Sequence, residues 1–294
     1  MTTWYPCYIK KQFEIDALYT AFERFADNNF DFKGESHGFY ELVCVVSGSV
    51  GVAAGDKIYT LERGDIAIHP PYQFHRIWSN PDTHPHFIII SFSARTQFAL
   101  DGVYATENAT FNSLMGVFRA VMGNCMFEKE QITQIINGRE LAIQKAVKTL
   151  ENIICDILEN PKNALEQSDI SRTAVRYSQI INCLEENYNM TLTVPQIAKL
   201  CNISESALKQ TFKKYSGIGV MEYFNNVKVK YAIGMLYKGS TIKEVSKALG
   251  FCDPNYFSTV FKRVTGVSPK NYINMKISGE NPKRYANNII DTEI

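Results

Sequence analysis

The last hundred residues of the sequence contain one pattern twice. Residues 193–196 (TVPQ) and 241–244 (TIKE) are both capping boxes, in which a threonine caps a helix and a Gln or Glu three residues later reaches back to the cap. At nearly the same offset, residues 212–217 (FKKYSG) match residues 261–266 (FKRVTG). A duplication at this spacing predicts two copies of one helical unit in this part of the chain.

Each copy has the outline of a helix-turn-helix. In the first copy a tight turn follows the short capped helix, and Ser204 then caps a second helix. In the second copy Asp253 is the cap, and Pro254 takes the first helical position. A long helix with an apolar stripe over residues 221–236 is expected to join the two copies.

The second copy also carries a family signature. The run GFCDPNYFSTVFKRVTGVSP over residues 250–269, followed by Tyr272, resembles the signature of AraC/XylS-type transcriptional regulators. The resemblance implies that the middle helix holds two recognition helices in successive major grooves of DNA, about 34 Å apart. Two positions depart from the pattern: Lys228, where many members have Arg, and Pro254, which leaves fewer polar side chains for base contacts.

The two recognition helices supply the candidate DNA contacts. Side chains near the start of such a helix enter the major groove, and basic residues further along it meet phosphates. The expected base contacts are Ser206, Lys209, Gln210, Asn255, Ser258 and Thr259. The expected phosphate contacts are Lys213, Lys214, Lys228, Lys262 and Arg263.

The distribution of charge supports a nucleic-acid partner for the C-terminal part. Residues 161–294 hold 18 Lys and Arg against 11 Asp and Glu, a net charge of +7, whereas residues 1–160 hold 13 against 19, a net charge of −6. A basic segment favours a polyanion, because binding releases counterions from it. Double-stranded DNA is therefore the expected partner, with RNA polymerase as a candidate second one.

The first hundred residues predict many short strands. Apolar runs rich in Val, Ile, Tyr and Phe alternate with Gly- and Pro-containing turn signals. The expected strands are 40–46, 50–54, 57–61, 66–69, 74–78 and 87–92. Strands at this spacing are typical of an antiparallel sandwich or barrel.

Two segments here resemble the cupin motifs of ligand-sensing domains in bacterial regulators. The first is HGFYE over residues 37–41, followed by Gly48. The second is GDIAIHP over residues 64–70, followed by His75 and Asn80. The resemblance implies that the barrel is a cupin-like sensor for a small molecule.

Strand alternation places His37 and Glu41 on one face, with His75 arriving from a neighbouring strand. Two histidines and a carboxylate are a ligand set for a transition metal, but metal cupins begin the first motif with HxH, and Glu35 takes the earlier position here. We therefore expect no metal or other cofactor, with His37, Glu41 and His75 as the ligands should one bind. The expected effector contacts are His37, Tyr40, Glu41, His75, Arg76 and Trp78.

These patterns predict a two-domain α+β chain. A cupin-like antiparallel β-barrel at about 1–105 is followed by helices within about 110–160, the second of them over 130–158, which pack on the barrel or form the seam of a homodimer. A polar linker with Pro161 is expected at 161–172, and an all-α domain of two helix-turn-helix units at 173–294.

Other features limit the classes of protein. No stretch approaches the about 20 uninterrupted apolar residues that a membrane-spanning helix needs, and the first residues lack the pattern of a secretory signal. The 7 cysteines include no CxxC pair, which disfavours a disulfide framework or a zinc finger. A cytoplasmic protein with reduced thiols and no membrane partner is the expectation.

The function that these patterns favour is sequence-specific DNA binding by a transcriptional regulator, not catalysis. Activation in response to a small-molecule effector is expected, and the family resemblance makes a sugar or sugar derivative the leading effector class. Two alternatives stay open at this point. One is a metal-dependent cupin enzyme tethered to a DNA-binding domain, and the other is a ligand-independent DNA binder whose barrel only dimerises.

Overall fold

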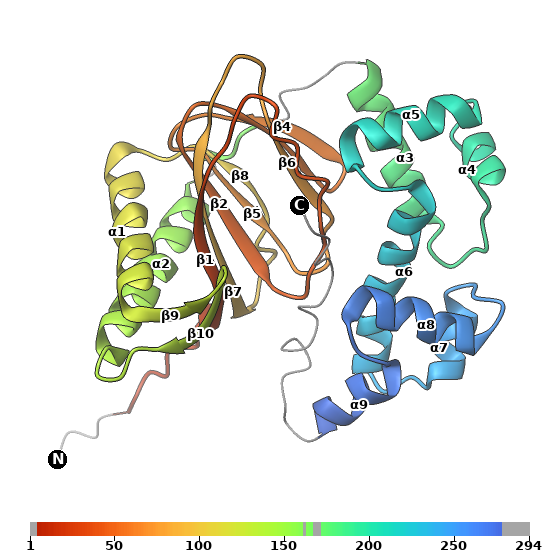
Figure 1. Ribbon diagram of the computed structural model, residues 1–294. Coiled ribbons are helices and arrows are strands. Elements are labelled where there is room, and N and C mark those ends of the chain that lie inside the picture. Colours follow the sequence, from red (N-terminus) through yellow and green to blue (C-terminus); the bar gives the residue numbers. More distant parts are fainter. Residues whose placement is uncertain (1–4, 161–162, 167–171, 278–294) are drawn as a thin grey trace.

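A β domain is followed along the chain by a helical domain, and the two lie side by side (Figure 1). This computed structural model describes residues 5–160, 163–166 and 172–277. The predicted fold class is confirmed, with β-sheet and helices first and an all-helical domain second. The domain limits at 160 and 173 stay a prediction, and most of the expected linker lies outside the described residues.

The strands of the β domain form two antiparallel sheets. The larger sheet has the strand order β8-β5-β2-β7-β1-β10-β9, and the smaller has the order β4-β3-β6. The strands are β1 (Phe13–Phe25), β2 (Tyr40–Ser47), β3 (Val50–Ala54), β4 (Lys57–Leu61), β5 (Ile66–His69), β6 (His75–Ser79), β7 (His86–Thr96), β8 (Gly102–Tyr104), β9 (Cys125–Glu128) and β10 (Gln131–Ile135).

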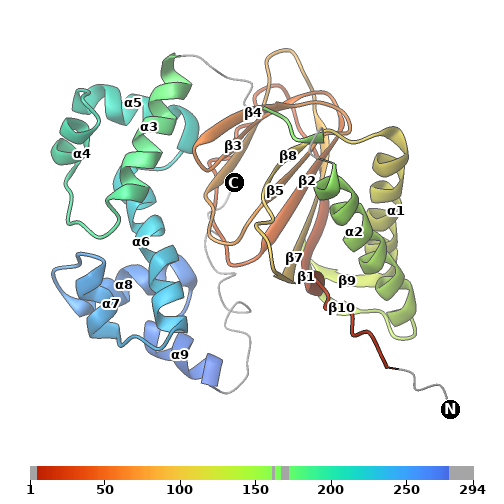
Figure 2. The same cartoon turned by 180° about the vertical axis from the view of Figure 1, so that it is seen from behind.

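Each face of the larger sheet has its own apolar core. Inward-facing side chains of both sheets, such as Val43, Val52 and Ile77, form a buried cluster inside the barrel. The opposite face of the larger sheet packs against α1 (Asn108–Asn124) and α2 (Glu140–Glu159), which lie side by side on it (Figure 2). Because side chains alternate between faces, the central strands β2 and β5 are buried on both sides.

Local patterning predicted most strands but missed the longest one. The strands expected at 50–54, 57–61 and 66–69 are confirmed residue for residue. The 13-residue strand β1 was not predicted, because register shifts against β7 between Ile15 and Thr20 interrupt its two-residue period.

The prediction of one helix over 130–158 is wrong at its start. The strands β9 and β10 form a hairpin there, with Lys129 in the turn at a φ of 54°, and Gln131 pairs with Thr20 of β1. The helix α2 begins only at Glu140. The isoleucines of this stretch have helical spacing, but pairing with the edge of the large sheet determines their conformation.

The helical domain contains the two predicted helix-turn-helix units. Its helices are α3 (Arg172–Glu186), α4 (Val194–Leu200), α5 (Glu205–Ser216), α6 (Val220–Tyr237), α7 (Ile242–Ala248), α8 (Pro254–Thr265) and α9 (Pro269–Ile277). The predicted capping boxes start α4 and α7, where Gln196 and Glu244 accept hydrogen bonds from the backbone of their threonine caps, each at 2.8 Å. Gly217 and Gly266 end the two recognition helices in the left-handed conformation.

The long helix α6 connects the two units, as expected. Phe224 and Val227 belong to the apolar core of the first unit, and Val229 and Leu236 belong to that of the second. Figure 1 shows α6 running between α5 at one end and α8 near the other. The two units therefore share one rigid element.

Lys228 lies between these two cores and requires a correction. Its side chain is 4% exposed, and its ammonium donates to the carbonyls of Met190 (2.7 Å) and Leu249 (2.8 Å). Burial lowers the pKa of Lys228 to about 8, so the group is still mostly protonated at pH 7. A buried ammonium that holds two backbone segments is not available to a phosphate, and the predicted phosphate contact at Lys228 is therefore wrong for this arrangement.

We expect Lys228→Met to destabilise the helical domain by about 2 kcal/mol, because two buried carbonyls lose a charged donor. Lys230→Met is the matched control, since Lys230 lies on the same helix with a side chain 44% exposed, in a surface ion pair with Glu185. Urea unfolding followed by circular dichroism measures both changes. Equal stability losses in the two variants would contradict the structural role of Lys228.

Candidate functional site

The first recognition helix, α5, presents a polar face to solvent. Ser204 caps it by accepting a hydrogen bond from the backbone nitrogen of Ala207 at 3.1 Å, and Leu208 and Phe212 are buried in the domain core. The DNA-contact candidates on α5 are all exposed: Ser206, Lys209, Gln210, Lys213 and Lys214. Exposure on one face is what contact with a DNA groove requires.

The second recognition helix, α8, offers fewer free polar groups. Asn255 and Thr259 are exposed, and Ser258 is half-buried. The hydroxyls of Ser258 and Thr259 donate to backbone carbonyls four residues earlier, so only their lone pairs face outward. Lys262 is exposed further along the helix. The base and phosphate contacts expected on both helices stay predictions.

In the β domain, three of the six effector candidates meet inside the barrel. Glu41 lies on the face of β2 that bears Val43, and His75 lies on the face of β6 that bears Ile77. His37 precedes β2, and its ring centroid is 4.9 Å from that of His75. The three side chains are buried, and we call them, together with Glu35, the sensor cluster.

Tyr40 does not join this cluster. It lies on the opposite face of β2, where its ring stacks on Phe92 with centroids 5.6 Å apart in the core beneath α1 and α2. Neighbouring residues of a strand point to opposite faces, so a ligand in the barrel does not reach both Tyr40 and Glu41. The prediction of Tyr40 as an effector contact is therefore corrected.

Glu35 is the member of the cluster that the sequence interpretation did not assign. Its backbone exchanges hydrogen bonds with that of His75 (2.9 and 3.0 Å), and a carboxylate oxygen lies 3.9 Å from His75 Nε2. The ligand atoms of Glu35, His37, Glu41 and His75 all lie within 4.8 Å of one another. The two-residue spacing from Glu35 to His37 was the available signal, because it places both side chains on one side of an extended segment.

The electrostatics of the cluster favour positive charge between the carboxylates. Burial acts to raise the pKa of Glu41, but His75 and His37 outweigh it and hold the pKa of this carboxyl well below its usual range. Burial and the charge of Glu41 raise the pKa of Glu35. Burial acts to lower the pKa of His75, but the charges of Glu41 and Glu35 outweigh burial, and the pKa of His75 is raised. The carboxylates therefore stabilise a cation at this point.

Arg76 and Trp78 point out of the barrel and contact the helical domain instead. Arg76 pairs in register with Ala53, on the outer face of the smaller sheet. Its guanidinium forms an ion pair with Asp31 and donates to the backbone carbonyl of Lys214 on α5. The guanidinium lies 5.3 Å from the ring centroid of Trp78, which packs against the core of the first helix-turn-helix unit. The predictions of both residues as effector contacts in the barrel are corrected for this reason.

Residues 31–36, which we call the docking segment, run between the sensor cluster and α5. At its start Asp31 forms an ion pair with Arg76, and near its end the backbone of Glu35 is hydrogen-bonded to that of His75. In the middle, the carbonyl oxygen of Lys33 contacts Gly217, the C-cap of α5. A Cβ added to Gly217 would lie 2.3 Å from this oxygen. The docking segment thus contacts both His75 of the sensor cluster and the recognition helix α5.

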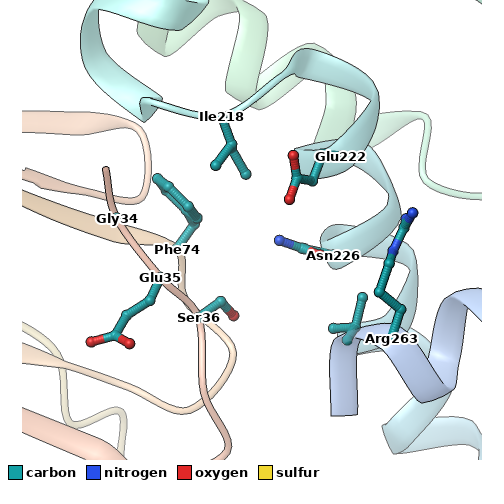
Figure 3. A pocket seen from close by; sticks show the side chains of 9 residues that line it. Gly34, Glu35, Ser36, Phe74, Ile218, Glu222, Asn226 and Arg263 are labelled. Carbon is teal, nitrogen blue, oxygen red and sulfur yellow. The ribbon is translucent and has the colours of Figure 1, made fainter. Parts of the chain in front are cut away.

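A small cleft lies between the docking segment and the helices α6 and α8 (Figure 3). Gly34, Glu35, Ser36 and Phe74 line one side, and the other side is lined by Ile218, Glu222, Asn226, Arg263 and Val264. Figure 3 shows the carboxylate of Glu35 pointing away from the helices, toward the barrel. Arg263, a predicted phosphate contact, is exposed but borders this cleft.

Two family models match the chain, one for each domain. A model described as an AraC-like ligand binding domain matches residues 18–112, and one described as a helix-turn-helix domain matches residues 197–275. The first range contains the sensor cluster, the docking segment, most of β1 and the strands β2 to β8. The second contains both recognition helices and the helix between them.

Individual relatives have low identity to the chain. YijO of Escherichia coli (strain K12), an uncharacterized HTH-type transcriptional regulator, is 30% identical over 145 residues, which is 48% of this chain and 50% of YijO. The HTH-type transcriptional activator RhaR of Enterobacter sp. (strain 638) is 25% identical over 244 residues, which is 81% of this chain and 86% of RhaR. The chain thus matches about half the length of the first relative and most of the second.

Among solved structures, the crystal structure of ToxT from Vibrio cholerae O395 matches 90% of this chain and 98% of its own. The sequence identity is 17% and the TM-score is 0.37.

We expect Gly217→Ala to loosen the docking segment from α5. Gly217 has a φ of +70°, so alanine there costs about 1 kcal/mol, and its Cβ also collides with the Lys33 carbonyl. Gly239→Ala is the control, because Gly239 has a φ of +95° but nothing within 4 Å of an added Cβ. Hydrogen exchange of residues 31–36 should accelerate only in Gly217→Ala, and unchanged protection there would contradict the contact.

Proposed function

The chain belongs to the AraC family of helix-turn-helix transcriptional regulators, a family without enzymatic activity, and we propose that it is an activator controlled by a small molecule in its β-barrel. It is a DNA-binding regulator with a ligand-binding domain. The observation that carries the proposal is the pair of capped recognition helices with exposed polar faces, joined by α6 and docked to a barrel with a buried polar cluster.

Activation is the proposed direction of regulation. RhaR, with which the chain shares 25% identity over most of its length, is named as a transcriptional activator. RNA polymerase is the enzyme whose action an activator raises, and we propose it as a second macromolecular partner beside double-stranded DNA.

The proposed effector is a polar small molecule, with a sugar or sugar derivative as the leading class. His37, Glu41 and His75 supply a carboxylate acceptor and ring nitrogens, and these are groups that hydrogen-bond sugar hydroxyls. The effector site therefore rests on these three residues, without Tyr40, Arg76 and Trp78.

The docking segment is the proposed route from effector to DNA. A ligand that moves Glu35 or His75 acts on a backbone that also contacts Arg76 and the end of α5. Two arrangements of this contact, with different affinities for the effector, suffice to couple the barrel to DNA binding.

A homodimer is the proposed assembly. The end of α1, the start of α2 and the β9–β10 hairpin lie on the side of the β domain away from the helical domain (Figures 1 and 2), and these elements carry exposed apolar residues. These residues are Met122, Met126, Ile135, Ile136 and Leu141. Exposed apolar side chains on neighbouring elements favour association, and sedimentation of the full chain gives its oligomeric state.

We expect DNA-contact variants to divide into two groups. Lys209→Ala and Gln210→Ala should each relax base preference at one position, at a cost of about 1–3 kcal/mol. Lys262→Ala should weaken binding to all sequences and lower the slope of log affinity against log salt by about 1. The operator is first selected from random DNA fragments, and affinities are then measured on it and on unrelated DNA at several salt concentrations.

The control for these variants is Lys145→Ala, which removes the same charge from an exposed position on α2. It should leave both specific and non-specific affinity unchanged. If Lys209→Ala, Gln210→Ala and Lys262→Ala all lose the same affinity on specific and on random DNA, the assignment of base and phosphate contacts is wrong.

We expect a sugar or organic acid that binds the barrel to raise the melting temperature of the full chain. At a ligand concentration of about 100 Kd the native state gains about 2.7 kcal/mol, which corresponds to several degrees. Glu41→Gln should abolish the shift, whereas Tyr40→Phe, on the opposite face of β2, should keep it. A ligand shift that survives in Glu41→Gln would place the effector elsewhere.

A further inference from the structure

The protonation of the two histidines in the sensor cluster follows from their backbone contacts. Nδ1 of His37 lies 3.1 Å from the carbonyl of Phe39, and Nδ1 of His75 lies 3.1 Å from the carbonyl of Gln73. A carbonyl can only accept a hydrogen bond, so each Nδ1 carries the proton. In a neutral imidazole the lone pair is then on Nε2.

Both of these Nε2 atoms face the carboxylate of Glu41. Nε2 of His37 lies 3.4 Å from one carboxylate oxygen, and Nε2 of His75 lies 3.3 Å from the other. Neither nitrogen has a well-directed hydrogen bond within the described residues, although both are buried. Two lone pairs facing a buried carboxylate repel it unless a proton on Nε2 or a metal ion between the groups supplies positive charge.

The spacing of the cluster fits a bound metal ion. Ligand atoms about 2.1 Å from a tetrahedral ion are about 3.4 Å apart. The three distances from the histidine Nε2 atoms to Glu41 and Glu35 are 3.3, 3.4 and 3.9 Å, and the four ligand atoms lie within 4.8 Å of one another. The Nδ1 donation to a backbone carbonyl is also the contact that orients metal-binding histidines in proteins.

We propose that Glu35, His37, Glu41 and His75 bind one divalent first-row transition-metal ion. Two imidazoles disfavour Mg²⁺ and Ca²⁺, which take oxygen ligands, and the two carboxylates neutralise the charge of the ion. The substitution of Glu35 for the first histidine of the cupin motif therefore changes the ligand set and does not remove it.

His69 is a neighbour of the site and not a ligand. Its ring stacks on His75 with centroids 4.3 Å apart, and its Nδ1 contacts the side-chain oxygen of Gln73 at 3.2 Å. It packs against a ligand ring and supports its orientation. The proposal goes beyond DNA binding and effector control, and it stands or falls without them.

The test is metal binding by the full-length chain after chelator treatment and dialysis. Mn²⁺ is the first probe, because its free form has a six-line electron paramagnetic resonance signal and it binds thiols such as the exposed Cys7 and Cys252 poorly. Zn²⁺ is added as a competitor, and Mg²⁺ as a hard cation that should not compete. We expect one Mn²⁺ per chain, displaced by Zn²⁺.

Two variants and one control identify the ligands. Glu41→Gln and Glu35→Gln should each weaken Mn²⁺ binding at least about 10-fold. His86→Gln is the control, because His86 pairs with Glu23 at 2.8 Å outside the cluster, and it should bind as the parent does. Circular dichroism checks that each variant is folded, and Glu35, half-buried at the rim, is the milder of the two substitutions.

Either of two results would overturn the proposal. One is a parent chain that takes up neither Mn²⁺ nor Zn²⁺ stoichiometrically. The other is a folded Glu35→Gln variant that binds Mn²⁺ with the affinity of the parent, which would assign the ion to another place on the chain.

Discussion

The two-residue period of strand β6 links the two domains. His75 points into the barrel toward Glu41, and the next residue, Arg76, points out to Asp31 and to the backbone of α5. The sensor cluster and the docking contact thus share one peptide unit. Because a shift of one residue in register would exchange the two faces, the register of β6 determines both contacts together.

In the helical domain, the buried Lys228 on α6 links the two helix-turn-helix units. The cores of its two helix-turn-helix units are separate, and α6 passes through both. Lys228 ties the loops beside them by donating to Met190 and Leu249, and its compact ammonium reaches both carbonyls from one buried point. The relative position of α5 and α8, on which simultaneous groove binding depends, is therefore held from within the domain.

The sensor cluster explains how a barrel filled with apolar side chains keeps a polar centre. The Glu41 carboxylate and two imidazoles are buried beside the half-buried Glu35, which is unfavourable unless protons or a metal ion supply positive charge. Two backbone hydrogen bonds hold Glu35 against His75 near the end of the docking segment, so the Glu35 carboxylate faces this charge. What occupies the cluster thus bears on the position of residues that contact the recognition helix.

The sequence by itself determined the repeated capped helices, most of the short strands and the family, because caps, turns and two-residue alternation are local properties. Tertiary structure alone decided the rest. Bulges conceal β1, and pairing with the edge of the sheet turns the start of an expected helix into the β9–β10 hairpin. Packing of the two domains directs Arg76 to α5, and burial gives Lys228 its structural role. Backbone hydrogen bonds bring Glu35 to His75. None of these contacts is local in sequence, so local patterns could not predict them.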